Sequence, residues 1–236
     1  MIKLFIWHLI VIALLSFATA APTITKERVQ KHAHTARAEV IDSIMLTVAE
    51  EAGKANGASV TNELGAIFKF IAGNHPASIN AVNAIVQLSR NPQAKVDVNL
   101  GQTIFGKYPE YKAVAKQLEK LVKSSASSKA VAAFIPIALA QPEHTRLDDA
   151  EKYVREATKD KNAKPADVAN SLYKQQQKQP LNFVTKANTK WVVDGSIAAM
   201  LAASGGDMID ISTFNEHLKK SHNSYLKDSN NVVIVF

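Results

Sequence analysis

The eleven residues 130–140 constrain the fold more than any other stretch of the chain, because they are apolar on every side. A helix without a polar face is normally buried among other helices, so this stretch predicts a central buried helix surrounded by the remaining chain. Pro136 lies inside it and should kink this helix or end it early, because proline has no amide hydrogen to donate. Membrane insertion is the alternative, but only Lys129 flanks the stretch, whereas inserting helices usually show a strong polar face or several basic flanking residues.

Apolar residues recur at three- and four-residue spacing through most of the remaining chain, which is the pattern of amphipathic helices. Alanine, the best helix former, is also abundant. We therefore predict an all-α fold, a multi-helix globular domain of roughly eight to ten helices around one core. The expected helices span about residues 35–56, 59–72, 76–90, 109–123, 145–157, 164–178, 197–203 and 213–225, with a short helix near 100–105. Residues 181–193 fit strands or helix ends, and residues 232–236 predict a short C-terminal strand or a hydrophobic clasp.

Individual side chains can be assigned roles within these expected helices. Ile79 is expected on the buried stripe of the helix over residues 76–90. His75 precedes Pro76, where a turn or a capping role is the simplest interpretation. Asp194 or Ser196 is expected to cap the helix over residues 197–203, since short polar side chains favour the position before a helix.

The serine-rich residues 124–128 are the strongest linker candidate in the chain. They either separate an N-terminal helical subdomain, residues 35–123, from a C-terminal one, residues 129–236, or only join two helices of one domain. Residues 21–34 are polar and are expected to form a flexible N-terminal arm.

The first twenty residues have the three parts of a secretory signal peptide. Lys3 gives a positive start, residues 4–15 are almost entirely apolar, and Ala18 and Ala20 are the small residues that a signal peptidase reads. We expect cleavage after Ala20 and secretion of the mature chain; an uncleaved signal anchor is the alternative.

Composition narrows the chemistry of the mature chain. It contains no cysteine, which excludes thiolate metal sites, disulfides and a cysteine nucleophile. The full chain has a formal charge of +7, and the mature chain has +6 because Lys3 is lost with the leader. Such an excess of positive charge attracts anionic surfaces weakly. One dense group of basic residues, together with the single mature-chain tryptophan, is the tentative interaction surface: Lys112, Lys116, Lys120, Lys123 and Trp191. A solvated helix face and a core tryptophan are the plainer interpretations.

The other polar motifs do not combine into a site. The adjacent carboxylates Asp148-Asp149 would point apart on a helix, whereas a catalytic pair must converge on one cleft. His32 and His34 have no further ligands nearby to complete a metal site. The turn Ser204-Gly205-Gly206-Asp207 lacks the residues of a phosphate-binding loop. No catalytic, metal or cofactor-binding residue is predicted, and the chain is expected to be non-enzymatic.

A cleaved leader, a polar arm and a cysteine-free helical body together resemble the layout of effectors secreted by filamentous plant pathogens. Of the Arg-x-Leu-Arg motif of the oomycete class, Arg37-Ala38-Glu39-Val40 matches only the first position, so the resemblance carries no functional residue. We predict a secreted, non-enzymatic interaction protein that acts on a host or neighbouring cell, with another protein as its partner. The alternatives are a secreted enzyme built from dispersed His, Asp and Glu residues, and a binder of anionic membranes or polymers. No specific nucleic acid is predicted as a partner.

Overall fold

The computed structural model describes residues 26–53, 57–140, 147–160, 162–178, 189–204, 214–216 and 218–220. These residues form ten helices and no strand, which confirms the prediction of an all-α, multi-helix globular fold. The chain divides into two units between Ala36 and Arg37, and the helices packed together belong to the unit that begins at Arg37. Within the described ranges, none of the helices combines the length and the apolar character needed to cross a bilayer.

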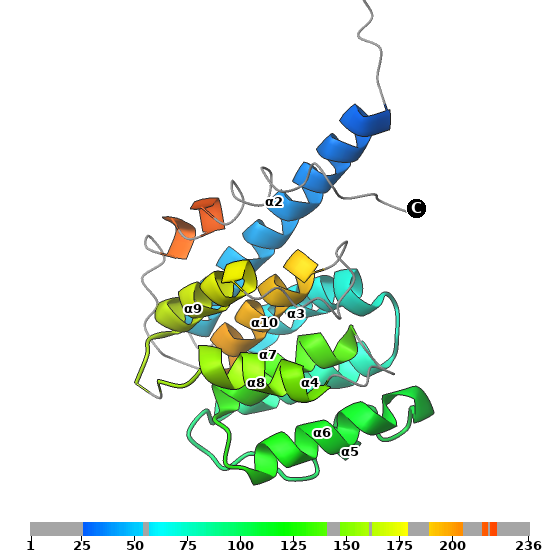
Figure 1. Ribbon diagram of the computed structural model, residues 1–236, viewed down its shortest axis with the longest axis vertical. Coiled ribbons are helices and arrows are strands. Elements are labelled where there is room, and N and C mark those ends of the chain that lie inside the picture. Colours follow the sequence, from blue (N-terminus) through cyan, green and yellow to red (C-terminus); the bar gives the residue numbers. More distant parts are fainter. Residues whose placement is uncertain are drawn as a thin grey trace, which may run out of the picture. The chain divides into compact units, whose positions relative to one another are not determined.

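The helices are named here in chain order (Figure 1). The first five elements are α2 (Lys26–Gly53), α3 (Gly57–Ala72), α4 (Ala77–Arg90), α5 (Leu100–Phe105) and the 3-10 helix η1 (Pro109–Tyr111). The remaining five are α6 (Lys112–Lys123), α7 (Ser128–Leu139), α8 (Leu147–Ala157), α9 (Pro165–Lys178) and α10 (Thr189–Ala203). Residues 214–216 and 218–220 are also helical, as the periodicity over 213–225 predicts.

Helix α7 is the centre of the compact unit. Every side chain from residue 130 to residue 139 is buried, which confirms the prediction drawn from its uniform apolar character. It packs against α3, α4, α6, α8 and, most extensively, α10, and Figure 1 shows it in the middle of these helices. Pro136 does not end the helix, which continues to Leu139. The Ser127 hydroxyl caps its start by accepting a hydrogen bond of 3.2 Å from the Ala130 amide.

The expected start of α10 is wrong. The helix begins at Thr189 rather than near residue 197, so Asp194 and Ser196 lie inside it and do not cap it. Both are fully buried. The Tyr173 hydroxyl donates to Asp194 Oδ1 at 2.9 Å, and the Ser196 hydroxyl donates to the Val192 carbonyl at 2.8 Å. These hydrogen bonds satisfy polar groups that would otherwise favour a helix terminus.

The expected burial of Ile79 is also wrong, since 67% of this side chain is exposed. Helix α4 buries a face that contains Ala81, Ala84 and Leu88. Val82, Ile85 and Val86 of the same helix are buried, so the predicted stripe is wrong only at Ile79, in the first turn of α4. Val86 lies within about 20° of Ile79 around the helix, so the direction of the side chain alone does not explain its exposure.

The serine-rich residues 124–128 form a hydrogen-bonded turn between α6 and α7. The Ser124 hydroxyl donates to the Leu121 carbonyl at 2.8 Å, and the Ser128 hydroxyl donates to the Pro92 carbonyl at 3.1 Å. Ser125 has a left-handed backbone with φ 59°, which turns the chain at the end of α6. The division into subdomains at this turn stays a prediction.

Three sequence predictions fall wholly or partly outside the described residues. They are the signal peptide over residues 1–20, most of the ambiguous segment 181–193, and the C-terminal strand over 232–236. Of the arm predicted over residues 21–34, the part from Lys26 onward is the start of helix α2. Its flexibility stays a prediction.

Candidate interaction surface

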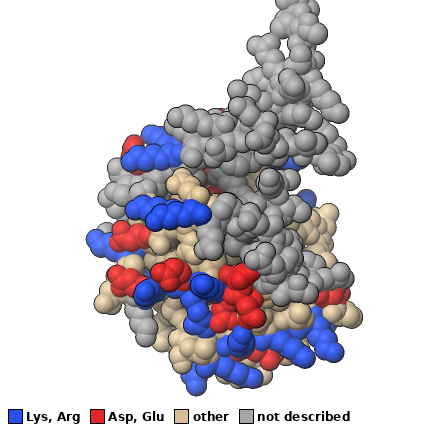
Figure 2. Space-filling view, viewed as in Figure 1, with Lys and Arg blue, Asp and Glu red and all other residues tan. Residues whose placement is uncertain are grey.

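Four lysines run along the exposed side of α6, and all four are exposed: Lys112, Lys116, Lys120 and Lys123. At about 100° per residue, Lys112, Lys116 and Lys123 fall within about 40° of one another, whereas Lys120 lies about 80° from Lys112. Figure 2 shows basic side chains along the lower edge of the molecule, where Figure 1 places α6. We call Lys112, Lys116 and Lys123 the basic stripe. None of the three makes an ion pair with a residue in the described ranges.

Lys120 differs from the basic stripe because it faces α8. Its ammonium group lies 2.8 Å from Asp148 Oδ1, the oxygen that also accepts from Gln117 at 3.0 Å. The hydrogen bond and the attraction of Asp148 raise the pKa of Lys120, and the hydrogen bonds from Lys120 and then Gln117 lower the pKa of Asp148. Both side chains are largely exposed, at 62% and 78%, so solvent weakens this pair. Its effect is to cancel the charge of Lys120.

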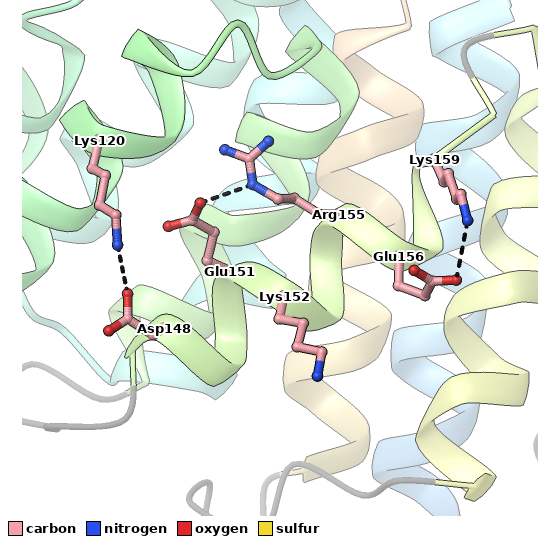
Figure 3. Close-up of a pocket in the computed structure, with 7 residues that line it drawn as sticks. All are labelled: Lys120, Asp148, Glu151, Lys152, Arg155, Glu156 and Lys159. Carbon is pink, nitrogen blue, oxygen red and sulfur yellow. Dashed lines mark hydrogen bonds and ion pairs between the residues drawn. The ribbon is translucent and has the colours of Figure 1, made fainter.

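A shallow groove of about 420 Å³ follows α8 beside this pair. Figure 3 shows that acidic and basic side chains alternate along it, with Lys120 contributed by α6 and the others by α8 and the residues just after it. Arg155 Nε donates to Glu151 Oε1 at 2.8 Å, and Lys159 lies 4.0 Å from Glu156. The Arg155 guanidinium also donates to the Ser124 hydroxyl, and Gln117 donates to Glu151. These contacts tie α8 to α6 and leave the groove with mixed, mostly neutralised charge.

Among the residues that the structure describes, His75 and Glu110 form the one acid–imidazole pair, with Nε2 and Oε1 2.9 Å apart. The Ala77 amide donates to His75 Nδ1 at 3.1 Å, which confirms the expected capping role at the start of α4. Because Nδ1 accepts, Nε2 must carry the hydrogen that is donated to Glu110. Hydrogen bonds from its own backbone amide and then from His75 lower the pKa of Glu110. Both ring nitrogens are therefore engaged in hydrogen bonds within the protein.

The buried polar side chains also serve packing. The Tyr111 hydroxyl donates to the Leu139 carbonyl at 2.9 Å, and the Tyr153 hydroxyl donates to the Leu172 carbonyl at 3.1 Å. Burial raises the pKa of Tyr111 to about 12 and raises the pKa of Tyr153 as well. Within the described ranges, no three His, Asp or Glu side chains form a group that could hold a metal ion.

The structure does not bring the five predicted surface residues together. The four lysines share the exposed side of α6, but Trp191 is only 5% exposed and lies on α10. The prediction also omitted Asp148, Glu151 and Arg155, which neutralise charge on the α6–α8 side. Their spacing of three and four residues along one helix is the signal that places them on one face.

No protein-family model, no curated protein and no solved structure matches this chain.

Proposed function

We propose that this chain is a secreted, non-enzymatic interaction protein that binds another protein through its helical surface. The observation that carries the proposal is the basic stripe of α6, three exposed lysines on one face that make no ion pair with a described residue, whereas the nearby Lys120 and Arg155 are paired. A cationic face of this kind steers a partner of opposite charge and sets its orientation. The occupied nitrogens of His75 further support a structural rather than a catalytic use of that imidazole.

The signal-peptide pattern of residues 1–20 supports export, and the effector-like layout supports action on a host or neighbouring cell. Mass spectrometry of the exported protein tests the first part of this proposal. We expect the mature chain to begin at Ala21. Retention of residues 1–20 in a membrane fraction would contradict cleavage and indicate a signal anchor.

Binding itself is tested with the mature chain as bait for extracts of candidate target cells. We expect one captured protein, once purified, to form a complex of defined stoichiometry with the mature chain in light-scattering measurements. A captured protein that forms no such complex after purification is a contaminant and counts against the proposal.

His75→Asn distinguishes a binder from an enzyme that uses this imidazole. Asparagine can still accept the Ala77 amide hydrogen bond at the start of α4, so the fold is expected to survive. We expect unchanged partner affinity in this variant. Turnover of a substrate by the natural chain that disappears in His75→Asn would overturn the non-enzymatic proposal.

A further inference from the structure

We propose that the basic stripe of α6 docks an acidic α-helix of a partner protein. The inference rests on the proposed function and deepens it by naming the surface and the chemistry of its partner. Lys112, Lys116 and Lys123 are exposed and make no ion pair with a described residue. A protein that carries carboxylates at matching spacing would supply the missing counter-charges.

The length and spacing of the stripe match one helix. At a rise of about 1.5 Å per residue, Lys112 and Lys123 are separated by about 16 Å along α6, or about three turns. Lysines four and seven residues apart lie on one face, so an adjacent helix can oppose them with carboxylates at the same two intervals. An extended peptide would need a different spacing, because a strand rises about 3.3 Å per residue.

One carboxylate lies on the same face as the stripe, and two more lie beside it. Glu119 lies about 20° beyond Lys112 on one edge of α6. On the other edge, Asp148 and Glu151 of α8 lie next to Lys120 and Gln117. A helix, about 10–12 Å across, would also cover Glu119, so the partner helix must carry no carboxylate opposite that position. A nucleic-acid duplex or an anionic membrane carries closely spaced phosphates and would place them against Glu119, at a cost in repulsion.

Apolar anchoring is also missing from this face. The large apolar side chains exposed in the described part of the chain are Val40, Phe70, Ile79 and Val98, and none belongs to α6. A membrane-binding helix normally buries apolar residues among the lipids. Contacts between exposed charges depend strongly on salt, so the complex should weaken as ionic strength rises.

The probe is a synthetic helical peptide with glutamates four and seven residues apart on one face. Its comparator has the same composition, with the glutamates spread around the helix. Binding to the mature chain is measured by fluorescence anisotropy at low salt and at about 0.15 M salt. We expect the one-faced peptide to bind more tightly than its comparator and to weaken at the higher salt.

The test variant carries Lys112→Glu, Lys116→Glu and Lys123→Glu. The matched control carries Lys69→Glu, Lys95→Glu and Lys174→Glu, which reverses three exposed lysines elsewhere and changes the net charge equally. We expect the test variant to lose about tenfold or more of the affinity for the one-faced peptide, and the control to lose much less. Circular dichroism of both variants verifies that the helical fold is kept.

Three results would overturn the proposal: equal losses in the two variants, equal binding of the two peptides, or tighter binding to duplex DNA or phosphatidylserine vesicles than to the one-faced peptide. If a purified natural partner binds the test variant with full affinity, this docking surface is wrong while the proposed function stands. If the mature chain forms no defined complex and instead turns over a substrate, the proposed function fails whatever the peptide does.

Discussion

Gly101 allows α5 to touch the backbone of α6. A Cβ atom at this position would lie 2.2 Å from the Ala115 carbonyl oxygen, a backbone atom that cannot rotate away. Gly101→Ala should therefore lower the free energy of unfolding by at least about 2 kcal/mol, as overpacked sites do. In α3, a Cβ atom at Gly65 meets nothing within 4 Å, so Gly65→Ala should gain about 0.5–1 kcal/mol from helix propensity. Urea denaturation measures both; equal stability of Gly101→Ala and the natural chain would contradict the close packing.

Tyr111 should make stability fall at high pH. Burial raises its pKa from 10.0 to about 12, so the folded state holds this proton more tightly than the unfolded state. Between these two values the unfolded chain binds fewer protons, and the free energy of unfolding therefore decreases as pH rises through this window. Below pH 10 this stabilisation is fully present.

Tyr111→Phe tests this linkage. The variant should lose about 1–2 kcal/mol at neutral pH, because the buried Leu139 carbonyl loses its donor. Between pH 10 and 12 its stability should fall less steeply than that of the natural chain. The stability of the variant should still fall somewhat with rising pH, since burial also raises the pKa of Tyr153. Parallel stability curves for the two proteins, from urea denaturation across this pH range, would show that Tyr111 does not carry the effect.

At the residue scale, local chemistry predicts some roles well. His75 was expected in a turn or as a cap because it precedes Pro76, and the structure shows the capping hydrogen bond. Its bond to Glu110, which lies 35 residues away, depends on how two segments pack and has no local signal. Ile79 shows where spacing fails, because it is exposed although Val82, Ile85 and Val86 at helical spacing from it are buried.

At the element scale, the turn between α6 and α7 is strained at one residue. Ser125 has φ 59°, a conformation that costs L-residues about 1–2 kcal/mol, whereas the residue after α3, Gly73, adopts a similar φ of 63° without that cost. Ser125→Gly should raise the free energy of unfolding by about 0.5–1 kcal/mol after the entropy of glycine is counted. Ser125→Ala retains the strain and should gain nothing. Thermal denaturation compares the two, and a destabilised Ser125→Gly would mean that the turn is not under strain.

Helix boundaries follow from sequence only where the chain itself supplies the signal. The serine before α7 caps it as serines commonly do, and α9 begins at Pro165 as expected. The predicted start of α10 was several residues too late, because Asp194, Gly195 and Ser196 resemble a helix start. Gly195 instead lets α10 approach α3 and α7 closely. A Cβ atom at this position would lie 2.5 Å from Ile71 Cδ1 and 3.4 Å from Pro136 Cβ. Such a tertiary contact cannot be read from local spacing.

At the scale of the whole molecule, the fold class and the central position of α7 were predictable because both follow from the pattern of apolar residues. The candidate interaction surface was only partly predictable. Spacing places the lysines on one side of α6, but the structure is needed to show that Asp148 neutralises Lys120 and that Trp191 is buried on another helix. Lys120 is neutralised and the other lysines of α6 are not, because only Lys120 lies next to α8, and the position of α8 is set by long-range packing.

The central claim is that the exposed lysines of α6 form the binding face. Amide chemical-shift mapping of the mature chain with the one-faced acidic helix tests it most directly. We predict that the largest shifts fall within Lys112–Lys123, with smaller shifts at the adjoining start of α8 near Asp148. Largest shifts over α3, α4 or α9, with α6 unchanged, would contradict the account.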